Sequence, residues 1–145
     1  MDDSRIDLAK YRLAQAKQCI ISAEKLYEIE DYKGAANRSY YSVFHSIRSV
    51  LALEKVDFKK HSAVISYFRK TYIKTGIFDV RLSDIISEAF DIRSDSDYDD
   101  FYIVSKKDIE EQIENVKYFY NEIEKYLEGA VKKPNLLGAL NNRVL

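Results

Sequence analysis

The segment AANRSYYSVFHSIR, residues 35–48, indicates how the rest of this chain folds. It contains no Pro, and its apolar residues recur at helical spacing, which predicts the middle of a helix. With successive residues about 100° apart, one side of this helix carries Ala36, Tyr40, Val43, Ile47 and Val50. The opposite side carries Arg38, Tyr41, Ser42, His45 and Ser49. We therefore expect the apolar side to face a core and the polar side to point away from it.

The composition favours a helical protein. With 145 residues, of which 46% are hydrophobic and 32% charged, the chain is expected to form one globular domain. Four Gly and one Pro supply few turns, so long helices are favoured over an all-β fold. The net charge of −1 argues against a large basic surface for duplex DNA, but it leaves room for a local cleft that binds single-stranded RNA.

The cellular location is predicted from what the sequence contains near its ends and in its apolar runs. Cys19 is the single cysteine, which is consistent with a reducing compartment. No apolar run approaches the roughly 20 residues that span a bilayer, and the first residues do not resemble a signal peptide. We expect a cytoplasmic protein that does not insert into a membrane.

Two long amphipathic helices are predicted at the ends of the domain. The first spans residues 4–30, with an apolar stripe of Ile6, Ala9, Leu13, Ala16, Ile20, Ala23 and Tyr27. The last is capped by Ser105, ends at Gly129, and has the stripe Ile109, Ile113, Val116, Tyr120, Ile123 and Leu127. Asp31 is expected to cap the helix of residues 32–54 that contains the opening segment.

Shorter helices are predicted between these long ones. The first covers residues 62–74 and turns Val64, Ile65, Phe68 and Tyr72 inward, with Gly76 as the stop signal after its end. The second covers residues 80–97, with Leu82, Ile85, Ile86, Ala89 and Phe90 inward, and residues 95–100 form an acidic loop. The pattern is typical of an all-α, up-and-down bundle of four to five helices over residues 1–129, followed by a loosely ordered tail, 130–145.

The opening segment also resembles a known family. Residues 37–45, NRSYYSVFH, are similar to the signature helix of the HEPN family (higher eukaryotes and prokaryotes nucleotide-binding domain), in which an Arg is followed by four to six residues and a His. Here six residues separate Arg38 from His45. Further stretches resemble a bacterial and archaeal branch of that family: KHSAVI at 60–65, TG at 75–76, AFDIR at 89–93 and DY at 97–98.

This resemblance implies a fold, an assembly and an activity. Family members are helical bundles that pair into dimers, with the Arg and His of both subunits meeting at the interface. Many are metal-independent endoribonucleases, often toxins encoded beside a small nucleotidyltransferase antitoxin, and others are non-catalytic nucleotide or RNA binders. Two positions depart from the toxin pattern. Ser39 follows the Arg where nucleases often carry Asn, Asp or His, and Ile47 replaces the Tyr that partners modify, so regulation by nucleotidylation there is not expected.

Arg38 and His45 are the predicted catalytic residues. An imidazole with a pKa near 6.5 moves the proton of a ribose 2′-hydroxyl or of a leaving oxygen, while a guanidinium binds the phosphate, and neither step needs a metal or another cofactor. Tyr41 and Asn37 are candidate substrate-binding residues, with a structural role for Tyr41 equally consistent with the sequence. No metal site is predicted, because the acidic run at 95–100 lacks the Gly and Glu of a calcium loop.

Other polar residues are interpreted as structural. Arg93 and Asp97 are four apart, which suits an ion pair within a helix. His61 is expected to cap a helix or lie on the surface, and the family-like block around it leaves a functional role open. Three functions remain open at this point. The first is a toxin-like endoribonuclease that acts as a homodimer, on RNA, with a nucleotidyltransferase antitoxin as its partner. The second is a non-catalytic nucleotide- or RNA-binding module that supports a nucleotidyltransferase, and the third is a helical dimer without a nucleotide role.

Overall fold

The computed structural model describes residues 3–132, which form five α-helices and one π-helical turn and contain no strand. In chain order these are α1 (Asp3–Glu28), α2 (Tyr32–Leu53), α3 (His61–Phe68), η1 (Arg69–Ile73), α4 (Arg81–Tyr98) and α5 (Lys106–Lys132). The predicted all-α bundle is therefore confirmed. Within the described residues, no helix is both long and apolar enough to cross a membrane.

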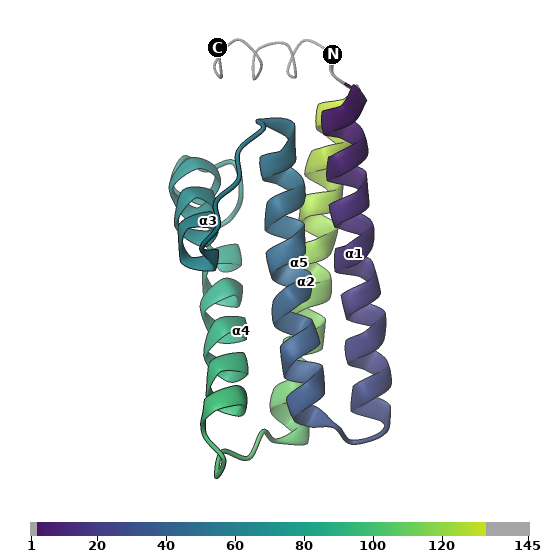
Figure 1. Cartoon of the computed structure of the whole chain (residues 1–145), viewed down its shortest axis with the longest axis vertical. Coiled ribbons are helices and arrows are strands. Elements are labelled where there is room, and N and C mark those ends of the chain that lie inside the picture. The colour runs from purple at the N-terminus through teal and green to yellow at the C-terminus, as the bar shows by residue number, and fades with distance from the viewer. Residues whose placement is uncertain (1–2, 133–145) are drawn as a thin grey trace.

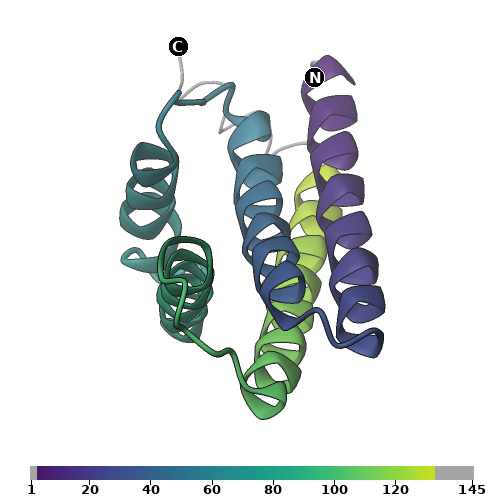
Figure 2. The same ribbon diagram turned by 60° about the horizontal axis from the view of Figure 1, so that its bottom comes forward.

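The helices are arranged around α2. Figure 1 shows α1, α2 and α5 running side by side, with α3 and α4 on the side of α2 that faces away from α1. The view in Figure 2 shows the same order, with α5 packed behind α1 and α2. Because α2 contacts α1, α3, α4 and α5, it has neighbours on most of its circumference.

The close packing of α1 on α2 corrects one expectation from the sequence. Ser42 and Ser49, predicted to point away from the core, are completely buried. The Ser42 hydroxyl donates a hydrogen bond to the carbonyl oxygen of Ala16 in α1, 2.9 Å away, and the Ser49 hydroxyl donates to the carbonyl of Ser46. Small side chains allow two helices to approach closely, and the hydrogen bonds compensate for the burial of the hydroxyl groups.

The core itself follows the predicted stripes. All six apolar residues predicted for the last helix are buried, and so are the four predicted for the helix that begins near residue 62. Beside them, aromatic rings gather where η1 meets α5, with Phe68 within 6.2 Å of Phe78 and Phe119 between ring centroids. The buried carboxylate of Glu54 accepts hydrogen bonds from the hydroxyls of Tyr67 and Tyr72, so this acidic group has partners inside the core.

The predicted caps are confirmed, whereas some boundaries were wrong. Asp31 Oδ1 accepts a hydrogen bond from the backbone N–H of Gly34 at 2.9 Å, and Ser105 Oγ accepts one from Asp108 at 3.0 Å. Gly76 has a φ of 85°, the left-handed conformation expected after a helix. Residues 95–98 are helical instead of part of an acidic loop, because α4 continues to Tyr98.

Two further differences concern single helices. Phe90 was expected inward but is 44% exposed, since Ile86 and Ala89 already fill the buried side of α4. The last helix does not end at Gly129. It continues to Lys132, and buried Ala130 extends its apolar stripe. Residues 133–145, most of the predicted tail, lie outside the described part of the chain.

Candidate functional site

The four residues predicted to form a site lie together on α2. Asn37, Arg38, Tyr41 and His45 are all half-buried. The Arg38 guanidinium lies 5.0 Å from the centre of the Tyr41 ring, and the Tyr41 ring is 6.2 Å from that of His45. Tyr41 therefore lies between the cation and the imidazole, as expected for residues three and four apart on one helix.

Asn37 has a more specific role than the sequence indicated. Its side-chain oxygen accepts two hydrogen bonds from Arg38, one from Nε at 3.1 Å and one from Nη2 at 2.7 Å. With the ring of Tyr41 beneath the guanidinium plane, these contacts hold Arg38 in one orientation. Asn37 thus positions the arginine, which retains further N–H groups that a phosphate oxygen can accept from.

The surroundings of His45 favour its neutral form. Burial lowers the pKa of its imidazole below the ordinary 6.5, and the positive charges of Arg48, Arg38 and Arg12 lower it further. Its Nδ1 atom is buried and has no hydrogen-bond partner among the described residues. A neutral imidazole at pH 7 can act as a general base, which an imidazolium cannot.

His61 is a part of this site that the sequence did not place correctly. It is the first residue of α3, but it neither caps that helix nor stands free on the surface. Its ring is half-buried and stacks on Phe44 with 3.9 Å between centroids, and its Nδ1 lies 3.1 Å from the hydroxyl of Tyr40. Burial lowers its pKa, and Arg93 and Arg48 contribute to the same shift.

Two further arginines, Arg12 and Arg48, lie near His45, and a single carboxylate pairs with both of them. Arg48 Nη2 lies 2.7 Å from Asp57 Oδ2, and Arg12 Nη2 lies 3.3 Å from the same oxygen. Arg12 is only 8% exposed and also donates to the carbonyl of Arg48. One carboxylate therefore serves two guanidinium groups, and a positive potential remains around His45.

Helix α4 contributes a cation from the other side. Arg93 Nε lies 2.8 Å from Asp97 Oδ2, which confirms the predicted ion pair. The same guanidinium lies 5.2 Å from the ring centre of Tyr40 and 5.6 Å from that of Tyr41. Arg93 is therefore both a structural residue of α4 and a border of the site on α2.

The assembled surface combines cationic and aromatic side chains. A groove of about 400 Å³ beside His61 is lined by Phe44, Arg48, Asp57, Phe58, Lys59 and His61. Guanidinium groups bind phosphates, and aromatic faces stack on bases. Within residues 3–132, no group of three or more His, Cys, Asp or Glu side chains is placed to hold a metal.

Sequence reasoning missed Arg12, Arg48, Asp57 and the stacking of His61. Arg48 follows His45 by three residues, so its helical spacing was a usable signal. The sequence carries no such signal for Arg12, which lies off the apolar stripe of α1, or for Asp57, which lies in a loop 45 residues further along the chain.

Known proteins resemble this chain over most of its length. A family model described as the HEPN domain matches residues 9–126. A protein of Methanocaldococcus jannaschii named "Putative toxin MJ0142" is 35% identical over 115 residues, which cover 79% of this chain and 78% of that protein. A UPF0332 protein of Thermotoga maritima is 27% identical over 83% of this chain and 92% of its own length. A second M. jannaschii protein, "Putative toxin MJ0605", is 29% identical over 78% of this chain and 84% of its own.

Proposed function

Because the chain belongs to the HEPN domain family, we propose that it is a toxin-like endoribonuclease that needs no metal ion. The names of two similar archaeal proteins contain the word toxin, which supports this reading. We further propose that it acts in the cytoplasm as a homodimer and that a nucleotidyltransferase antitoxin is its partner.

The proposed chemistry assigns one step to each residue. Neutral His45 takes the proton of a ribose 2′-hydroxyl, and the 2′ oxygen attacks the adjacent phosphorus. The bond to the 5′ oxygen breaks, that oxygen takes up a proton from water, and the protonated His45 returns its proton to water. The products are a 2′,3′-cyclic phosphate and a free 5′-hydroxyl. Arg38, oriented by Asn37, holds the phosphate and offsets the charge that develops on its oxygens. Tyr41 supports Arg38 and offers a face to a base.

The observation that carries this proposal is a half-buried imidazole with a lowered pKa beside a guanidinium that is held in place. The test is RNA cleavage in buffer containing EDTA. The wild type should produce 2′,3′-cyclic phosphate ends, and Arg38→Lys should lose activity because an ammonium does not reproduce the planar fork. Arg5→Lys, on α1, is a matched control because lysine can still donate to the Leu53 carbonyl that Arg5 contacts. Activity that disappears with EDTA would exclude this mechanism.

One observation favours the alternative, a non-catalytic nucleotide- or RNA-binding module that supports a nucleotidyltransferase. Ser39, at the position where nucleases of the family often carry a functional polar side chain, is 1% exposed and cannot reach a substrate. Under this alternative the protein binds RNA or a nucleotide without cleaving it. Expression should then leave growth unaffected, whereas a nuclease should arrest growth, and Arg38→Ala or His45→Ala should relieve the arrest.

The proposed dimer and partner are tested separately from the chemistry. The small residues Ser42 and Ser49 do not support a close contact between two chains, because α1 of the same chain already covers this side of α2. The dimer proposal therefore rests on the family. Light scattering at high micromolar concentration should show two chains per particle, and a monomer would count against it. Co-purification with a nucleotidyltransferase encoded beside this chain is expected, and failure to bind would weaken the toxin–antitoxin assignment.

A further inference from the structure

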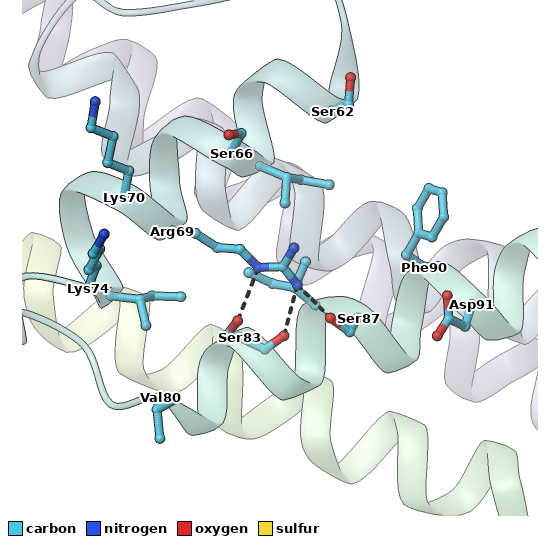
Figure 3. Close-up of a pocket in the computed structure, with 13 residues that line it drawn as sticks. Ser62, Ser66, Arg69, Lys70, Lys74, Val80, Ser83, Ser87, Phe90 and Asp91 are labelled. Carbon is cyan, nitrogen blue, oxygen red and sulfur yellow. Dashed lines mark hydrogen bonds between the residues drawn. The ribbon is translucent and has the colours of Figure 1, made fainter.

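A second cleft lies away from the α2 site. It lies between α3 with η1 on one side and α4 on the other, and has a volume of about 610 Å³ (Figure 3). Three cations line it, namely Arg69, Lys70 and Lys74, together with four serines and an apolar floor. Asp91 is the one carboxylate in its lining, at the end near Phe90. The cleft is therefore positively charged and partly apolar.

Arg69 is fixed in position at the centre of this cleft. Its Nε donates to Ser83 Oγ at 3.1 Å, and its Nη2 donates to the carbonyl of Ser83 at 3.1 Å and to Ser87 Oγ at 2.6 Å. No acidic side chain in the described residues pairs with it, and its Nη1 has no hydrogen-bond partner among them (Figure 3). A guanidinium held by neutral oxygens keeps its full charge, and an anion can bind it without first displacing a carboxylate.

Lys70 in η1 and Lys74, the residue directly after η1, add two exposed charges. They are four residues apart, and neither forms an ion pair in the described part of the chain. A π-helical turn widens the helix locally and often occurs at functional sites. Three cations against one carboxylate suit a ligand with more than one negative charge.

The cleft adjoins the α2 site. Its lining residue Ser62 follows His61 directly in the sequence, and Phe90 lies with its ring 6.1 Å from that of Tyr40, which also contacts Arg93 and His61. Phe90 is 44% exposed although it is large and apolar. An exposed ring between two cationic clusters is the arrangement on which a base stacks while the phosphates on either side are neutralised.

We propose that this cleft is a second phosphate subsite, which binds the RNA strand next to the phosphate held by Arg38, with Phe90 stacking on the base between them. The proposal rests on the proposed function, since it takes RNA as the ligand. It assigns Arg69, Lys70 and Lys74 to strand binding outside the reacting atoms, so their loss should affect long substrates and spare the shortest one.

The test compares Lys70→Ala/Lys74→Ala with the charge-matched control Lys10→Ala/Lys25→Ala. The control residues lie exposed on α1, on the other side of α2 from the cleft (Figure 1). Binding of a labelled single-stranded RNA is measured by fluorescence anisotropy in a His45→Ala background, which prevents cleavage. Cleavage is measured with His45 intact, on a dinucleotide and on the longer RNA. Phe90→Ala is a third variant, and thermal denaturation verifies that each variant folds.

The loss of two phosphate contacts should lower the slope of log Kd against log salt concentration by about 1.4. At 0.1 M salt this corresponds to a Kd that is roughly 10- to 25-fold higher. Phe90→Ala should weaken binding by about 5-fold or more. The control double variant should bind like the parent protein. On the dinucleotide, which is too short to reach the cleft, kcat/KM of Lys70→Ala/Lys74→Ala should equal that of the wild type.

The outcomes separate this inference from the proposed nuclease activity. If the wild type cleaves RNA and the cleft variants bind and cleave as it does, the subsite is wrong and the nuclease assignment stands. If the variants lose binding in a protein that does not cleave, the subsite is supported and the nuclease assignment is wrong. If RNA binding is unchanged but association with a protein partner is lost, the cleft is a docking site for protein and the RNA assignment is overturned. If the wild type does not bind RNA, both are overturned.

Discussion

The chain contains two histidines, and the structure predicts that their removal has opposite consequences. His45→Ala should lose about 10²–10⁴-fold in cleavage rate, which corresponds to about 3–5 kcal/mol in the activation barrier. Its stability should change by no more than about 1 kcal/mol. The ring packs against Tyr41 and Phe44, but its buried Nδ1 lacks a partner, and removing that atom recovers a desolvation cost of about 1–3 kcal/mol.

His61→Ala should show the reverse pattern. It loses the stacking contact with Phe44 and the hydrogen bond with Tyr40, each of which contributes about 0.5–1.5 kcal/mol. A total of about 1–3 kcal/mol corresponds to a decrease in Tm of roughly 4–10 °C for a chain of this length. Because His61 is assigned no proton transfer, its cleavage rate should remain within about tenfold of the wild type at a temperature where the variant is folded.

The assays are cleavage of a labelled RNA in EDTA and thermal denaturation followed by circular dichroism, on both variants and the wild type. Each histidine variant serves as the control for the other. Full activity in His45→Ala would refute the assignment of the base. A large loss of activity in His61→Ala together with unchanged stability would move the proton transfer to His61.

Three other measurements follow from the same contacts. Arg48→Gln removes a charge that lowers the pKa of His45, so the acid limb of the pH–rate profile should move to higher pH. Asp57 retains its contact with Arg12 in this variant. An acid limb that does not move would contradict the electrostatic argument. Both histidines have a pKa below 6.5 in the folded state, so the unfolded chain binds more protons just below pH 6.5. Stability should therefore fall as the pH drops from 6.5 through the lowered pKa values of the two histidines. The double variant His45→Ala/His61→Ala should flatten this dependence of Tm on pH. Ser42→Ala should lower the free energy of unfolding by about 1 kcal/mol through the loss of one buried hydrogen bond. Ser42→Leu should lower it by about 1–3 kcal/mol through overpacking against α1. If both variants were as stable as the wild type in urea denaturation, α1 and α2 would be less closely packed than described.

Local patterns in the sequence were sufficient to predict the helices. The apolar stripe of α5 and the caps at Asp31 and Ser105 depend on residues within one or two helical turns, so spacing alone predicts them. The proximity of Arg38, Tyr41 and His45 follows from the same periodicity. Where a helix ended late, at Lys132 instead of Gly129, the buried neighbour Ala130 outweighed the weak helix propensity of glycine.

The tertiary structure decided which side of α2 remains accessible and what surrounds its histidine. From the sequence alone, the serines of α2 belong to a polar surface, and only the position of α1 shows that Ser42 faces the carbonyl of Ala16. Likewise, Arg12 meets Asp57 across 45 residues of sequence, and Tyr40 meets His61 across 21. Helical periodicity gives the direction in which a side chain points from its own axis. Which groups it then meets depends on how separate helices pack, and in this protein that packing determines the pKa of His45.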